Sequence, residues 1–273
     1  MVFIPNYFIL LYQLKLKYSH SKPSFMASTS ETGIDVNVAN FRKLTLTATA
    51  FGTAYNPSNS TITLQALNVL CTNADHAVDE ANKAIAAHIK VANDREVAFG
   101  ALNQRATQLI NALEVSGATP QTMDNAKTIL RKLRGQRSTP KLTEAEKAAL
   151  LAEGKEVTQI SASQLGYDNR IANFGKLLDL IETEPQYAPN EDELKLLNAR
   201  AYYTALKTAN DAVAAAEVRV NNARKQRNAI FSTPITGMLA VADTTKKYVK
   251  SVFNSSSNEY KQVVDLKFTT LKK

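Results

Sequence analysis

The sequence predicts an all-α fold, an elongated antiparallel bundle of three long helices with shorter helices packed at their ends. Apolar residues recur at alternating steps of three and four over long stretches, which is the spacing of one buried helix face. Glycine and proline are scarce, with 9 and 8 in 273 residues, so few residues interrupt a helix. Cap and turn residues separate the periodic stretches and mark where helices begin and end.

Residues 1–25 differ from the rest of the sequence and are expected to be a leader that is disordered or not native. Their apolar run is followed by lysines, whereas a signal peptide carries positive charge before the run. The run is also too short to span a bilayer, which takes about 20 residues. Met26 is a plausible true start. A start codon assigned too early, an export signal and a genuine N-terminal arm all stay open.

Residues 34–55 are expected to form the first helix of the bundle. Residues 55–59 contain a proline between polar residues and predict a turn. Ser58 or Ser60 is then the expected N-cap of the next helix, because a serine side chain can accept a hydrogen bond from a backbone N–H of the first turn.

The stretch from Leu64 to Leu113 carries the clearest apolar stripe and predicts one long helix. Only His88 and Arg95 on this stripe are neither apolar nor sulfur-bearing. Such a helix cannot bury its stripe alone, so other helices must cover it. The stripe consists of Leu64, Leu67, Cys71, Ala74, Val78, Ala81, Ile85, His88, Ala92, Arg95, Phe99, Leu102, Ala106, Leu109 and Leu113.

Two shorter helices are expected after this long helix. Gly117 is suited to the left-handed position that ends a helix. Thr119 as N-cap and Pro120 at the first helical position then begin a helix that runs to about Arg134. A capping box over 143–146 opens the second short helix, which ends near residue 153.

A second stripe lies within residues 155–183 and predicts another long helix. Gln164 is its one polar position. Residues 184–189 contain two prolines and predict a linker. The stripe consists of Val157, Ile160, Gln164, Tyr167, Ile171, Phe174, Leu178 and Ile181.

A third long helix is expected from a capping signal at Asn190 and Glu193 to about Phe231. One of its faces is rich in alanine, which lets a neighbouring helix approach closely. Pro234 ends it, and shorter helices are expected over 235–253 and from the turn at 254–257 to about residue 271. The alanine face consists of Ala201, Ala205, Ala209, Ala212 and Ala216.

The two halves of the sequence are similar enough to suggest an internal duplication. Arg95 and Phe99 are matched by Arg227 and Phe231, and both pairs lie late in a long helix that follows a proline-containing turn. Convergence on a helical pattern is the alternative explanation. The predicted organisation is a first long-helix unit over 26–183 and a second over 190–273, packed into one bundle.

Three segments together resemble a group of bacterial helical proteins with no assigned activity. They are the opening at Met26 to Gly33, the turn at Tyr55 to Ser58 and the run from Ser138 to Glu144. The resemblance covers nearly everything after Met26 and brings no catalytic motif with it. It implies a bacterial cytoplasmic origin and supports Met26 as the natural start.

Composition and motifs favour a non-enzymatic protein without a cofactor. There is no phosphate-binding glycine loop and no nucleophile elbow. The single cysteine, Cys71, excludes an internal disulfide, is compatible with the cytoplasm and lies on the apolar stripe as a small core residue would. His76, near Glu80, lacks the converging ligands that a metal site needs, so we expect a solvated side chain.

His88, Arg95 and Gln164 are expected to form buried polar layers in the bundle. A polar residue on an apolar seam can fix the register of the helices that pack there. A gap where the bundle opens around these residues, including a ligand site, is the alternative. Neither interpretation requires a bound metal.

The strongest surface feature is a cluster of cations without an acid among them, which we call the basic cluster. It could bind the phosphates of nucleic acid or lipid, but it lacks interleaved aromatic residues and a helix-turn-helix signature. Cations near a helix C-terminus also stabilise the helix itself. The basic cluster consists of Lys127, Arg131, Lys132, Arg134, Arg137 and Lys141.

These observations predict a cytoplasmic helical scaffold that binds a protein partner or self-associates, with no membrane span. The net charge of +8 permits an acidic partner without requiring one. Association with nucleic acid through the basic cluster is the second interpretation. A helical pore-forming protein that inserts residues 235–242 is a third, based on shape alone.

Overall fold

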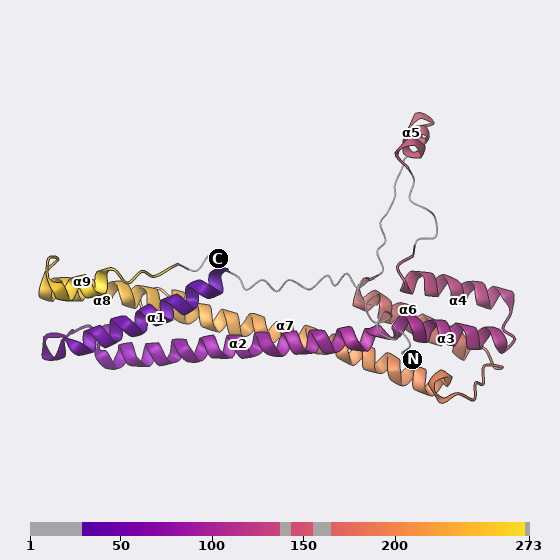
Figure 1. Ribbon diagram of the computed structural model, residues 1–273, viewed down its shortest axis with the longest axis horizontal. Coiled ribbons are helices and arrows are strands. Elements are labelled where there is room, and N and C mark those ends of the chain that lie inside the picture. Colours follow the sequence, from indigo (N-terminus) through magenta and orange to yellow (C-terminus); the bar gives the residue numbers. More distant parts are fainter. Residues whose placement is uncertain (1–28, 137–142, 155–164, 271–273) are drawn as a thin grey trace, which may run out of the picture. The chain divides into compact units, whose positions relative to one another are not determined.

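The computed structural model describes residues 29–136, 143–154 and 165–270 (Figure 1). Over these residues the chain is helical and contains no strand, so the all-α prediction is confirmed. None of the helices in these ranges combines the length and apolarity needed to cross a bilayer. The α-helices are α1 (Thr29–Ala50), α2 (Leu64–Gly100), α3 (Leu102–Val115), α4 (Pro120–Leu133), α5 (Glu144–Ala152), α6 (Tyr167–Glu182), α7 (Leu196–Ser232), α8 (Met238–Phe253) and α9 (Asn258–Val264).

The stripe predicted for one long helix is shared by α2 and α3, which are separated at Ala101. Gly100 precedes this break, and glycine is the weakest helix former after proline. The interruption is slight, because Ala101 itself keeps a right-handed helical conformation, with φ of −84° and ψ of −9°. Every position of the stripe is buried or half-buried. The predicted buried face is therefore correct, whereas the uninterrupted helix is not.

The first helix, predicted over 34–55, is α1 at Thr29–Ala50. The starts of α2 and α7 differ from the predictions because short 3-10 turns precede both of these 37-residue helices. These turns are Ser60–Ile62 before α2 and Asp192–Leu194 before α7. Asn59 caps the first turn, and the Thr63 hydroxyl accepts from the N–H of Ala66 in α2, so neither Ser58 nor Ser60 caps this helix. The capping signal at Asn190 likewise precedes a turn instead of α7 itself.

Other caps lie where the sequence predicts them. The Thr119 hydroxyl accepts from the N–H of Thr122 at 3.2 Å, with Pro120 as the first residue of α4. Thr143 and Glu146 form the predicted capping box of α5. The long helix expected over 155–183 is described from Tyr167 to Glu182, so its residues Val157, Ile160 and Gln164 lie outside the described part.

The described residues form two compact units. One contains residues 29–75 and 230–270, and the other contains residues 76–229. In the first unit, α1 packs against α8 and α9. The side-chain amide of Asn37, which is fully buried, donates to the carbonyl oxygen of Thr269 and accepts from its N–H, both at 2.8 Å. These bonds hold the segment after α9 against α1.

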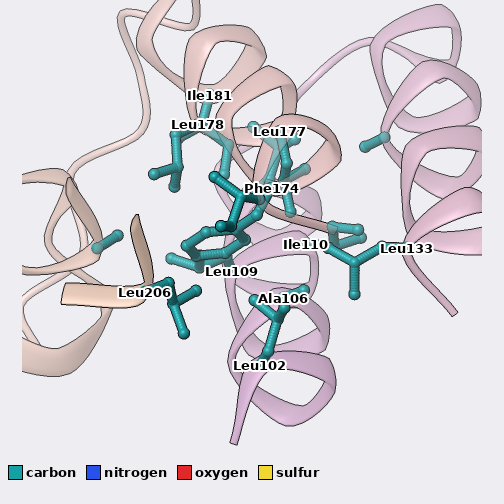
Figure 2. Close-up of a cluster of buried hydrophobic side chains, with 14 of the residues drawn as sticks. Leu102, Ala106, Leu109, Ile110, Leu133, Phe174, Leu177, Leu178, Ile181 and Leu206 are labelled. Carbon is teal, nitrogen blue, oxygen red and sulfur yellow. The ribbon is translucent and has the colours of Figure 1, made fainter. Parts of the chain in front are cut away.

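The second unit has its core where α6 packs on α3 and α4 (Figure 2). Phe174, Leu177 and Leu178 of α6 are fully buried there among side chains of α3, including Leu102 and Leu109. Leu206 of α7 adds a further buried side chain, on the side of this core opposite Leu133 of α4. The labelled core residues are Leu102, Ala106, Leu109, Ile110, Leu133, Phe174, Leu177, Leu178, Ile181 and Leu206.

Candidate functional site

The most unusual chemistry in the described residues surrounds Arg95 in the unit of residues 76–229. Four helices, α2, α3, α6 and α7, contribute to this cluster, which we call the Arg95 cluster. The long helix α2 supplies the arginine late in its apolar stripe, and α6 and α7 supply the residues that it contacts. The Arg95 cluster consists of Arg95, Phe99, Arg105, Tyr167, Asp168, Arg170, Tyr202 and Asn210.

The Arg95 guanidinium is held by a ring and an amide instead of a carboxylate. Its central carbon lies 3.8 Å from the centroid of the Tyr167 ring, and its Nη1 donates to Oδ1 of Asn210 at 3.1 Å. The amide of Asn210 donates in turn to Oδ1 of Asp168 at 2.8 Å. The amide therefore links the cation to an acid indirectly. Arg95 Nε is buried and has no hydrogen-bond partner among the described residues.

Phe99 and Arg170 extend the stack beyond Tyr167. The ring of Phe99 meets that of Tyr167 edge to face, with centroids 4.8 Å apart, and the guanidinium of Arg170 lies 5.4 Å from the Phe99 centroid. Burial lowers the pKa of Arg170, and the neighbouring Tyr167 and Tyr202 oppose this effect. Its Nε is also buried without a partner in the described part of the chain. The stack thus holds two partly desolvated cations.

Tyr202 connects α7 to α2 at the other end of the cluster. Its hydroxyl donates to the carbonyl oxygen of Ala98 at 2.7 Å, and its ring lies under the guanidinium of Arg105 at 4.6 Å. Burial raises the pKa of Tyr202, while Arg105 and Arg170 lower it. A raised pKa keeps the phenol protonated, as a donor to Ala98 requires. The Arg95 cluster therefore joins four helices, α2, α3, α6 and α7.

Two of the three residues predicted as buried polar layers lie in the described part of the chain. His88 and Arg95 are half-buried, and Gln164 lies outside the described residues. The partners of Arg95 on α6 and α7 were not predicted as site residues from the sequence. The one local signal is the pair Tyr167 and Arg170, an aromatic residue and an arginine one helical turn apart.

The basic cluster is only partly free to contact a ligand. Lys127 Nζ lies 3.8 Å from Oε1 of Glu114, and Arg134 donates to the Thr107 hydroxyl at 2.7 Å. Arg131 is half-buried and Lys132 is exposed, both in the last turn of α4. The remaining predicted members, Arg137 and Lys141, lie outside the described residues.

Cys71 and His76 were considered above as a nucleophile and a metal ligand. No group of three histidine, cysteine or carboxylate side chains converges within residues 29–136, 143–154 and 165–270. Cys71 is buried, and this burial raises the pKa of its thiol, with Asp75 adding to the effect and Arg42 opposing it. His76 is exposed. A thiol with a raised pKa is a poor nucleophile at neutral pH.

Several grooves open on the described part of the unit of residues 76–229. One of about 910 Å³ lies between the end of α3 and the turn before α7. A second of about 510 Å³ lies between α4 and α6 and is lined by Lys132, Lys176 and Asp179 among others. The third, also about 510 Å³, runs between α2 and α7 and is lined by Val91, Asp94, Ala201, Thr204, Ala205, Thr208, Ala209 and Ala212. We call it the alanine groove.

Comparison of the chain with protein-family models, with curated proteins and with solved structures found no match.

Proposed function

We propose that the protein is a non-enzymatic helical scaffold that binds an apolar helix of a protein partner in the alanine groove. The supporting observation is the lining of this groove. Ala201, Ala205, Ala209 and Ala212 follow one another at helical spacing along α7, and Ala201 and Ala205 are exposed. The twelve residues from Ala201 to Ala212 extend over about 17 Å of helix, enough to accept two to three turns of a partner helix.

Small side chains favour such a partner because they let two helix backbones approach closely. The polar side chains of the lining are those of Thr204, Thr208 and Asp94, and the other five lining residues are alanine or valine. Asp94 already has a partner, since Lys90 Nζ lies 2.7 Å from its Oδ2. The proposed partner face is therefore apolar and small, with little charge. We assign the scaffold to the cytoplasm of a bacterium on the strength of the single cysteine and the sequence resemblance.

The test is capture of partners from native cells with the intact protein and two variants. Ala205→Arg places a long charged side chain in the groove, whereas Ala215→Arg places it at an exposed position that does not line the groove. A true partner should be lost with Ala205→Arg, kept with Ala215→Arg and unaffected by nuclease treatment. Equal capture by both variants would contradict the proposal.

We infer in addition that the two halves of the chain arose by duplication. The Tyr55 hydroxyl donates to the carbonyl oxygen of Ile62 at 2.7 Å, and the Tyr187 hydroxyl donates to that of Leu194 at 2.8 Å. Each tyrosine is followed by a proline two residues later, then by a 3-10 turn and a 37-residue helix. The features keep one spacing of 132 residues: 55 and 187, 62 and 194, 95 and 227, 99 and 231.

The first helices of the two halves support the same inference. Phe41 in α1 and Phe174 in α6 are both fully buried, and so are Leu44 and Leu177 one turn later. At the other end, Gly117 and Asn254 both adopt positive φ, 85° and 64°, just after α3 and α8. A convergent helical pattern would reproduce the apolar spacing but has no need to repeat a tyrosine-to-carbonyl bond over seven residues.

Binding of nucleic acid is the second candidate, and one observation favours it. Lys132 of the basic cluster lines the same groove as Lys176 of α6, so cations of two helices face one surface. Asp179 lines this groove as well and reduces its positive charge. Contact with phosphates there would be independent of base sequence.

A further inference from the structure

Each compact unit combines parts of both halves of the chain. We define the first half as residues 29–136 and the second half as residues 165–270. In the unit of residues 76–229, α6 of the second half packs on α3 and α4 of the first. In the other unit, α1 of the first half packs on α8 and α9 of the second. The first helix of each half thus packs against the last two helices of the other.

The contacts between the halves are core contacts rather than surface contacts. Phe174 and Leu177 of α6 are fully buried, and they belong to one apolar cluster with Leu109 of α3 and Leu133 of α4 (Figure 2). A first half without a second half would expose α3 and α4 on this side. Exposed apolar area of this kind drives association with any surface of matching shape.

The unit of residues 29–75 and 230–270 has a polar contact between the halves as well. Besides the two bonds between Asn37 and Thr269, the amide of Asn40 donates to the carbonyl oxygen of Lys267 at 2.7 Å. Tyr55 meets Tyr248 edge to face at 5.2 Å, and the N–H of Asn56 donates to the Tyr248 hydroxyl at 3.1 Å. Directional bonds of this number make the surface selective for its own complement.

We propose that two copies of the chain self-associate by exchanging halves. The first half of each copy packs on the second half of the other, so both units form twice with the contacts that they have in one chain. The surface fits a second copy because that copy carries the same complementary half. This inference rests on the contacts between the halves and does not depend on their common ancestry or on the alanine groove.

The balance between the single chain and the exchanged pair is set by concentration. The covalent connection between the halves runs from Gln136 to Leu165. Packing of the two halves is intramolecular within one chain, whereas exchange requires a second chain and depends on the protein concentration. Exchange is therefore favoured when unfolded chains are concentrated and find each other before they close on themselves.

The test uses paired cysteines in a Cys71→Ser background, joined by a short bis-maleimide. Thr122→Cys with Glu184→Cys reports on one unit, because the Thr122 hydroxyl and Glu184 Oε1 are 2.8 Å apart across the two halves. Asn40→Cys with Lys267→Cys reports on the other. Arg42→Cys with Asp75→Cys is the matched control, since this 2.6 Å ion pair lies within the first half and stays within one chain in either state.

Each variant is unfolded in denaturant, refolded at about 1 μM and at a concentration roughly a hundredfold higher, separated by size and then crosslinked. Exchange predicts that concentrated refolding yields a dimer. In this dimer both inter-half pairs should give crosslinked products of twice the chain mass of 29.9 kDa, and the control pair should give crosslinks within single chains. Refolding at low concentration should give single-chain products for all three pairs.

Two outcomes would overturn the proposal. One is a dimer whose inter-half pairs crosslink only within single chains, which identifies an ordinary surface contact. The other is the absence of any dimer after concentrated refolding. Should a cysteine variant fail to fold, two differently tagged copies of the unchanged protein give the same information. They should co-purify when mixed before unfolding and remain separate when mixed afterwards.

Discussion

The hydroxyl of Tyr202 donates a hydrogen bond to the main-chain carbonyl oxygen of Ala98, connecting α7 to α2. Ala98 lies three residues before the break at Ala101, so the tyrosine offers a side-chain partner to a carbonyl close to the end of a helix. The same ring is covered by the guanidinium of Arg105 and meets Phe174 of α6 edge to face at 5.8 Å. One side chain thus links α7 to three other helices through a hydrogen bond, a cation–π contact and an aromatic contact.

Tyr202→Phe should destabilise the protein by about 1 kcal/mol, because it removes the hydrogen bond and keeps the ring. Chemical denaturation followed by circular dichroism measures the change. Tyr203→Phe is the matched control at the adjacent, half-buried position and should change the free energy of unfolding by less than about 0.5 kcal/mol. Equal effects of the two substitutions would show that the bond to Ala98 contributes nothing.

Arg95→Leu should leave the free energy of unfolding within about 1 kcal/mol of the unchanged protein. The substitution loses a cation–π contact, worth about 0.5–2 kcal/mol, but it also removes a buried Nε that has no described partner. Asn210 keeps its bond to Asp168. We expect the cost to appear as looser helix register, measured as faster amide hydrogen exchange in α2. A loss above about 3 kcal/mol would instead indicate that the guanidinium is held by a strong charge partner.

Stability should fall as the pH rises between about 10 and 12. Burial raises the pKa of both Tyr55 and Tyr187 to about 12. An unfolded tyrosine ionises near pH 10, so above this pH the folded state holds protons that the unfolded state has released. Tyrosinate absorbance and denaturation at several pH values would follow the effect. Tyr55→Phe and Tyr187→Phe should each make the fall shallower, and a stability independent of pH in this window would refute the assignment.

Binding of DNA through the groove between α4 and α6 would depend steeply on salt. Each phosphate neutralised on duplex DNA contributes a log–log slope of about −0.9, whatever the base sequence. Changing Lys132 and Lys176 together to glutamine should flatten the slope by roughly two such contacts. Lys207→Gln with Lys261→Gln, both at exposed positions elsewhere, should change it much less. Equal retardation of DNA by both double variants would rule out this surface. So would the absence of retardation by the unchanged protein at micromolar concentration and low salt.

The sequence was sufficient to predict which faces of the helices are buried, because burial follows helical spacing. All positions of the stripe from Leu64 to Leu113 are buried or half-buried. The positions Ile171, Phe174, Leu178 and Ile181 of the second stripe are buried. Caps at Thr119 and Thr143 were also predictable, since they depend on neighbouring residues alone.

Features that depend on distant residues could not be predicted in this way. The partners of Arg95 come from α6 and α7, and no local pattern joins Asn210 to it. The turns before α2 and α7 were missed because each ends at a residue whose carbonyl oxygen accepts a hydrogen bond from a tyrosine seven positions earlier, a contact that cap signals do not reveal. The repeat of these bonds was present in the sequence as a tyrosine followed two residues later by a proline, a signal too short to distinguish from chance.

The bonds between Asn37 and Thr269 join residues 232 positions apart, which has a consequence for synthesis of the protein. A ribosome adds roughly 5–20 residues per second, so the apolar side of α1 leaves the exit tunnel roughly 10–50 s before the helices that cover it. During this interval α1, which carries Phe41 and Leu44, lacks the helices α8 and α9 against which it packs in the finished chain. We expect the nascent chain to bind a general chaperone through α1 and to release it only when α9 has emerged.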